Sequence, residues 1–285
     1  MRAHIAGLIV LGLAAILLPQ AARADWVASA LDKWVQLPDV EMGMDVNATW
    51  KKTTKDEAGQ PLTEPQPWYP YIKTLADDFL CQSAGPITQV HVWGSWLNDA
   101  VNANATFKLS IHDDIPSDGT VPSRPGNELR HWLFEPGQYL VQPWNPGSTT
   151  KEDFFEPNTN QIIGSDTQIF LYNFRIPETE QFIQEGTAAI PKVYWLDVEA
   201  ILPLDSPEVF GWKTSYQHWN DDAVYGDTDD PMYPPTEWTE LRDPRYVDGM
   251  APSLDMAFVI TPEPATMALL GLGVAGLVAR RRSKK

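Results

Sequence analysis

The chain has 285 residues, of which 38 are acidic and 21 basic, and its formal net charge at pH 7 is −17. Because phosphate groups are bound by cations, this balance excludes nucleic acid as a partner. The single cysteine, Cys81, excludes an internal disulfide framework. A strand would place Cys81 on the same face as Phe79, so we expect a buried apolar side chain there.

The N-terminus has the pattern of a secretory signal peptide. Arg2 precedes an apolar run at 5–18, and small residues follow at Ala22 and Ala24, the two positions that signal peptidase reads. The run is shorter than the about 20 residues that a membrane-spanning helix needs. We therefore predict a signal helix within 1–24 and cleavage after Ala24, and the alternative is an uncleaved membrane anchor.

Residues 25–260 show the period-two alternation of half-buried β-strands. It is clearest in four runs, at 107–111, 170–176, 194–198 and 254–260. Further strands are predicted at 87–97, 131–134, 139–144, 210–214 and 238–242, and a turn is predicted at 135–138. The chain has 25 prolines and 18 glycines, which punctuate these short strands. The pattern predicts an all-β fold, an antiparallel and jelly-roll-like β-sandwich.

Three segments are expected to lie outside the strands. A proline and nearby acidic residues suit the start of a short helix within 176–186. The polar, proline-containing stretches 51–66 and 221–235 are predicted to be long surface loops. Because no internal repeat is found, we predict one β-sandwich ectodomain at 25–260, followed by a C-terminal segment at 261–285.

The mature ectodomain is more acidic than the whole chain. The signal peptide and the C-terminal segment hold seven basic residues and one acidic residue, so 14 basic and 37 acidic residues remain and the net charge is near −23. Acidic pairs recur at 77–78, 113–114, 221–222 and 229–230. Calcium takes about six to eight oxygen ligands, often from loop carboxylates, although such pairs also form a plain solvated surface. Asp77 and Asp78 are the predicted ligands of a structural calcium ion, and no other cofactor is expected.

The chain contains 12 tryptophans, and several lie beside histidine in the groups 91–96 and 210–222. Exposed aromatic rings stack on the apolar faces of sugars, but the same rings also supply large buried area in a core. A strand would place His91 and Trp93 on one face and Trp96 on the other, so at most one of these two sets faces solvent. The candidate glycan-binding residues are Trp93, Trp96, Trp212 and Trp219.

Signatures of catalysis are missing from the sequence. It has no G-x-S-x-G, H-E-x-x-H or C-x-x-C motif. Two carboxylates hydrolyse glycosides when they lie about 5–10 Å apart, but so many acidic residues do not single out a pair. We expect a non-catalytic ligand-binding or structural domain, and the alternative is a secreted glycan-active hydrolase with unrecognised catalytic carboxylates.

The C-terminus has three parts in strict order. Pro262, Glu263 and Pro264 come first, an uncharged apolar segment follows at 265–279, and a basic cluster ends the chain. An apolar helix followed by basic residues is a stop-transfer pattern, with the basic cluster on the cytoplasmic side. Because the apolar segment is short for a bilayer, it indicates a membrane helix that anchors the chain only transiently.

This tail resembles the PEP-CTERM sorting signal. The resemblance implies that an exosortase, a membrane cysteine transpeptidase-like enzyme, recognises Pro262, Glu263 and Pro264 together with Arg280, Arg281 and Arg282. It also implies transfer from the inner membrane to the cell surface or the extracellular matrix of bacteria that make extracellular polysaccharide. The implied partners are exosortase and signal peptidase, with polysaccharide or surface proteins as ligands. The alternative is a plain C-terminal tail anchor.

The ectodomain itself resembles a domain of unknown function that recurs in exported proteins with this tail. The segments that carry the resemblance are 33–38, 75–79, 91–96 and 210–213. The resemblance covers most of 33–260 and implies a single domain, but it implies no activity.

Overall fold

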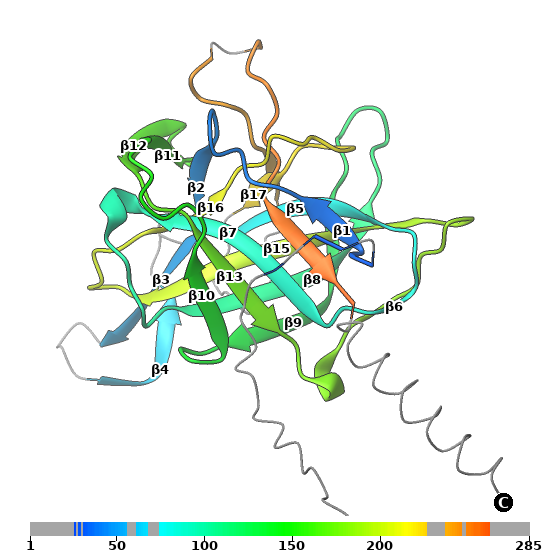
Figure 1. Cartoon of the computed structure of the whole chain (residues 1–285), viewed down its shortest axis with the longest axis horizontal. Helices are drawn as coiled ribbons and strands as arrows, with labels where there is room; N and C mark the ends of the chain where they lie inside the picture. Colours follow the sequence, from blue (N-terminus) through cyan, green and yellow to red (C-terminus); the bar gives the residue numbers. More distant parts are fainter. Residues whose placement is uncertain are drawn as a thin grey trace, which may run out of the picture.

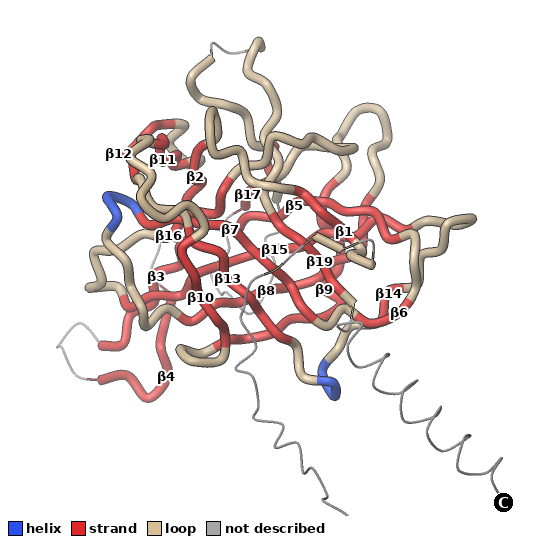
Figure 2. The backbone as a smooth tube through the Cα atoms, in the orientation of Figure 1, coloured by secondary structure: helices blue, strands red, loops and turns tan. Residues whose placement is uncertain are grey.

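The computed structural model describes residues 26, 28–29, 31–55, 61–67, 74–226, 237–246 and 249–262. It confirms a sandwich-like all-β fold, with two large curled sheets around a shared core (Figure 1). In these ranges the only helical pieces are two 3-10 turns, Leu97–Asp99 and Glu178–Glu180 (Figure 2). No helix there is long and apolar enough to span a bilayer. The predicted signal helix and membrane helix lie outside the described residues.

The first sheet has nine strands and is organised around β7 (Gln89–Trp96). One edge of β7 pairs with β13 (Phe170–Arg175), and the other edge pairs first with β19 (Phe258–Thr261) and then with β16 (Phe210–Lys213). The remaining strands are β1 (Trp34–Gln36), β2 (Met44–Asn47), β10 (Tyr139–Pro143), β11 (Glu152–Glu156) and β12 (Gln161–Asp166).

The second sheet has eight strands and is organised around β15 (Lys192–Pro203). One edge of β15 pairs with β8 (Thr106–Ile115), and the other pairs with β5 (Thr74–Cys81) and β3 (Thr49–Lys55). The remaining strands are β4 (Pro61–Pro67), β9 (Arg124–Phe134), β17 (Val224–Gly226) and β18 (Thr239–Glu240). A separate pair joins β6 (Gly85–Pro86) to β14 (Ile183–Gln184). The described pairings are antiparallel except β11–β2 and β15–β3, which are parallel.

Alternation along the strands builds the core and also leaves polar residues in buried positions. On β8, Phe107 and Leu109 point into the space between the sheets, as the sequence predicts. Lys108, Ser110 and His112 point to the opposite, outer face of the sheet, yet they are as fully buried as the core residues. Buried charges need partners, so the outer faces of the sheets are where polar networks form.

Cys81 lies in the same core cluster as Phe79 and is 2 % exposed, which confirms the prediction of a buried apolar thiol. The predicted turn at 135–138 also stands between β9 and β10.

Several predicted boundaries are wrong. The stretch 51–66 contains the end of β3 and most of β4 instead of one long loop, and 224–226 forms β17 within the second expected loop. The strand expected at 254–260 begins only at Phe258, because the Met256 amide donates to the Asp77 carboxylate and the chain before it makes only isolated bridges. The strand expected at 238–242 is reduced to β18.

The prediction of a short helix at 176–186 is also wrong beyond its first turn. Glu178–Glu180 forms a 3-10 turn, and the chain then extends so that Ile183 pairs with Pro86. Pairing with β6 therefore overrides the local helix-start signal.

Candidate functional site

A group of buried charged residues lies on the outer face of the nine-stranded sheet. It consists of Asp45, Glu152, Asp166, Lys213 and Ser95, and we call it the carboxylate cluster. Its position follows from alternation, because apolar neighbours of Asp45, Lys213 and Ser95 point into the core, namely Met44, Val46, Trp212 and Trp96. The parallel pairing of β11 with β2 and the β11–β12 hairpin then bring Glu152 and Asp166 alongside.

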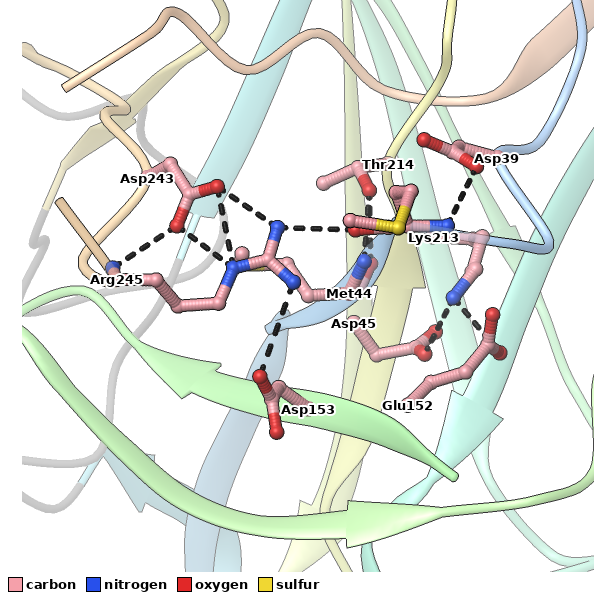
Figure 3. A network of polar contacts seen from close by, with 10 residues as sticks. Asp39, Met44, Asp45, Glu152, Asp153, Lys213, Thr214, Asp243 and Arg245 are labelled. Atoms are coloured by element: carbon pink, nitrogen blue, oxygen red, sulfur yellow. Dashed lines mark hydrogen bonds and ion pairs between the residues drawn. The ribbon is translucent and has the colours of Figure 1, made fainter. Parts of the chain in front are cut away.

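The carboxylate cluster is compact and closed to solvent. Lys213 Nζ lies 2.8 Å from Glu152 Oε2 and 3.3 Å from Asp45 Oδ2 (Figure 3). Asp166 faces Glu152 across the β11–β12 hairpin. One carboxylate oxygen from each of Asp45, Glu152 and Asp166 lies within 4.8 Å of the other two. Since none of these residues is more than 5 % exposed, water does not compensate their charges.

Burial sets the protonation of the carboxylate cluster. Burial raises the pKa of Asp45 and of Glu152, although the charge of Lys213 partly opposes it. Burial and the nearby Asp45 charge raise the pKa of Asp166 to about 9. Burial lowers the pKa of Lys213, but Asp45 and Glu152 outweigh it and the net shift is upward. At neutral pH the lysine is therefore charged and Asp166 holds a proton.

Neighbouring residues fix the carboxylate cluster in place. A Cβ atom on Gly211 would lie 2.7 Å from Asp45 Cβ and 2.7 Å from Phe154 Cζ, so only glycine fits between them. The Arg245 guanidinium bonds to both carboxylate oxygens of Asp243 (Figure 3). It also donates to the Met42 carbonyl at 2.9 Å. Arg245 thus ties the segment 237–246 to the start of β2.

A second network lies on the outer face of the eight-stranded sheet. Lys108 Nζ lies 3.4 Å from Glu128 Oε2 and 3.9 Å from Glu199 Oε1. Next to it, His112 Nε2 and Asp197 Oδ2 are 2.7 Å apart. Burial raises the pKa of Glu199 to about 7, while Lys108 and His112 hold the pKa of Asp197 below its usual value despite burial. We call these five residues the Lys108 network.

The two residues predicted to bind calcium do not converge on one site. Asp77 and Asp78 are successive residues of β5, so their side chains point to opposite faces. Asp77 Oδ2 accepts hydrogen bonds from Gln36 Nε2 at 2.9 Å and from the Met256 amide at 2.7 Å. Asp78 instead accepts from Asn220 Nδ2. Within the described residues, only Asp45, Glu152 and Asp166 bring three metal-ligating groups together.

Three of the four predicted glycan-binding tryptophans are buried, so they cannot stack on a sugar. Trp93, Trp96 and Trp212 are at most 1 % exposed. Trp93 packs on the outer face of the sheet and Trp96 in the core, as alternation predicts. Neither face of β7 therefore exposes its tryptophan to solvent. Trp219 differs, because it is half-buried and packs edge-on against Trp34 with ring centres 5.1 Å apart.

A cavity of about 410 Å³ opens between β2, β3 and the loop that follows β15. Leu204, Pro207 and Val209 provide its apolar lining, and the polar lining consists of Asn47, Thr49, Lys51 and Ser206. No carboxylate is among these described lining residues. The Lys51 amine is already held by the Ser206 carbonyl at 2.6 Å and by the Glu208 carbonyl.

Sequence reasoning missed the carboxylate cluster, although weak signals for it exist. Lys213 lies in the segment 210–213 and Ser95 in the segment 91–96, both of which carry the resemblance to the domain of unknown function. Asp45 stands between two apolar residues in a short alternating run. No comparable signal in the sequence singles out Glu152 or Asp166.

The comparisons with known proteins assign the chain in two steps. The PEP-CTERM protein-sorting motif matches residues 261–282, which makes the chain an exported protein that exosortase processes and that reaches the cell surface. The chain belongs to the family described as domain of unknown function (DUF7901), whose model matches residues 32–261. Both results confirm the resemblances seen in the sequence. No curated protein and no solved structure matches the chain.

Proposed function

We propose that the β-sandwich is a non-catalytic component of the cell surface or extracellular matrix that binds a glycan after exosortase processing. The placement of its carboxylates supports this proposal most. Asp45, Glu152 and Asp166 are buried in the carboxylate cluster, and Asp197 and Glu199 in the Lys108 network. Hydrolysis needs carboxylates that reach a bound substrate, and these are closed off within the fold.

The position of the anchor also supports a role in surface display. The sorting motif begins where β19 ends, and β19 lies between β1 and β7 in the nine-stranded sheet. Residues 258–260 are fully buried. A force that acts on the C-terminal segment is therefore distributed over hydrogen bonds from β19 to two neighbouring strands. This suits a domain that is tethered through its C-terminus.

The segment 216–219 is the best candidate for the glycan contact. Trp219 is half-buried, and Tyr216 beside it is 56 % exposed. Trp34 supports the Trp219 ring from one side. Aromatic rings with an apolar face and a polar handle suit a sugar ring at a wet surface.

A glycan array tests this proposal with the full-length protein and extracellular polysaccharides of the host. We expect binding by the wild type and a loss of at least about tenfold in affinity for Trp219→Ala, equivalent to about 1.4 kcal/mol. Tyr246→Ala is the matched control, because Tyr246 is 54 % exposed and lies in another segment. The proposal is wrong if the wild type binds no glycan or if Trp219→Ala binds as tightly as the wild type.

One observation favours a second candidate function, a glycan-active hydrolase. Gln36 Nε2 lies 2.9 Å from Asp77 Oδ2 and 3.4 Å from Asp255 Oδ2, which places two carboxyl groups close together. These two acids are as buried as those of the other networks, at 0 % and 1 % exposure, so this candidate has less support than the non-catalytic role. Burial raises the pKa of Asp255 to about 6 and that of Asp77 well above its usual value. Acids with raised pKa values serve in catalysis. Release of reducing ends by the wild type but not by Asp255→Asn would favour the hydrolase over the non-catalytic proposal.

A further inference from the structure

We infer that the carboxylate cluster binds one divalent cation of the calcium type through Asp45, Glu152, Asp166 and Ser95. The inference concerns a site distinct from the glycan-binding segment and does not depend on it.

The first argument is a set of carboxylate oxygens without partners. Lys213 engages Asp45 through Oδ2 and Glu152 through Oε2. The other oxygens of these residues, Oδ1 and Oε1, and both carboxylate oxygens of Asp166 make no hydrogen bond of normal geometry in the described part of the chain, although Asp45 and Asp166 lie close to each other. A buried polar atom without a partner costs about 1–3 kcal/mol, and more when it is charged. Four such oxygens in one place indicate a missing positive partner.

The second argument is independent of the acidic residues. Ser95 is on β7, carries no charge and is fully buried. Its hydroxyl lies within interaction distance of the Asp45 and Asp166 carboxylates, but its oxygen forms no hydrogen bond of normal geometry with any described residue. An acid-rich composition does not explain a serine aimed into the same space. Ser95 brings the number of available oxygens to five.

The donor set selects the kind of cation. Calcium takes about six to eight oxygen ligands in flexible geometry, so five side-chain oxygens leave room for water or a carbonyl. Magnesium demands a near-ideal octahedron and retains several waters, which suits a closed site less well. Zinc prefers nitrogen and sulfur ligands, and neither histidine nor cysteine belongs to the carboxylate cluster.

The charges agree with a divalent ion. Three ionised carboxylates and one ammonium group carry a net charge of −2, which one divalent cation neutralises. The ammonium group of Lys213 repels the ion, so we expect a dissociation constant near the about 0.1–1 mM of extracellular calcium modules.

Calcium titration of the chelator-treated, full-length protein tests the inference. We expect one calcium ion per chain and a Tm higher by roughly 5–10 °C at calcium about 100-fold above the dissociation constant, with little effect of equal magnesium. Asp166→Asn should abolish this shift. Glu199→Gln is the matched control, because Glu199 is an equally buried acid in the Lys108 network, and it should keep the shift.

Two results would overturn the inference: no calcium-dependent shift in the wild type, or a shift that survives in Asp166→Asn. If Asp166→Asn does not fold, Ser95→Ala replaces it, since it removes one oxygen and no charge. Its calcium affinity should be weaker by at least about fivefold, roughly 1 kcal/mol. An unchanged affinity in Ser95→Ala would equally overturn the inference.

Discussion

Replacement of Lys108 by methionine should destabilise the domain strongly, because it removes the cation of the Lys108 network and leaves the acids. Methionine preserves most of the buried stem, so the change leaves only a small cavity. Asp197 and Glu199 remain at 0 % and 1 % exposure with no positive charge from the lysine. His112 still contacts Asp197, but it does not reach Glu199 within the described contacts.

The expected magnitude follows from the geometry. Breaking a buried ion pair by removing one partner costs about 3–5 kcal/mol. The two ion pairs of Lys108 are long, at 3.4 Å and 3.9 Å, and its amine makes no well-formed hydrogen bond with the described residues. We therefore expect a loss of unfolding free energy at the lower end of this range, about 3 kcal/mol. For a domain of this size, this corresponds to a Tm lower by roughly 6–12 °C.

Urea denaturation and thermal unfolding of the full-length protein measure this effect. Lys192→Met is the matched control, because Lys192 pairs with Glu185 at the surface, where its side chain is 48 % exposed, and such exposed pairs contribute little to stability. The double variant Lys108→Met/Glu199→Gln should regain part of the lost stability. The reasoning is refuted if Lys108→Met is as stable as Lys192→Met, or if the double variant is less stable than Lys108→Met.

Two further predictions concern the Lys108 network and the carboxylate cluster. Burial raises the pKa of Glu199 in the folded state to about 7 from its usual 4.5, so the folded state binds this proton more tightly than the unfolded state. The contribution of Glu199 to stability is then fully present below about pH 4.5 and is lost as the pH rises to about 7. Glu199→Gln should therefore flatten the pH dependence of the unfolding free energy between these two pH values. An unchanged slope would contradict the raised pKa of Glu199. Gly211→Ala should lower the unfolding free energy by about 1–3 kcal/mol, since the new methyl group overlaps Asp45 and Phe154 at 2.7 Å; urea denaturation with an unchanged midpoint would show that this contact is not tight.

The strands that the sequence predicted well are those in which apolar residues alternate with polar ones. β8, β13 and β15 follow this pattern, and so does β7, where Trp93 and Trp96 point to opposite faces. The sequence predicts a loop over most of β3 because lysine and threonine dominate it, but parallel pairing with β15 and antiparallel pairing with β4 make it a strand. Local composition does not encode that pairing.

The candidate site was harder to predict, because its residues are far apart in the sequence. Asp45, Glu152 and Lys213 meet only through the pairing of β2 with both β11 and β16. Acidic pairs in the sequence suggest a metal site, but adjacent residues on a strand point to opposite faces, as Asp77 and Asp78 do on β5. Likewise, tryptophans beside histidine indicated a sugar-binding surface, whereas burial of Trp93 and Trp212 shows that most of these rings pack the interior.

Surface labelling of intact cells tests most directly whether the β-sandwich is displayed through its sorting motif. Lys192 has a side chain that is 48 % exposed and accessible to a membrane-impermeant amine reagent. We predict labelling of the wild-type protein on intact cells, whereas the variant with Pro262, Glu263 and Pro264 replaced by alanine should remain unlabelled and unprocessed in the inner membrane. Equal labelling of both proteins, or a wild type that is labelled only after cell lysis, would contradict the account.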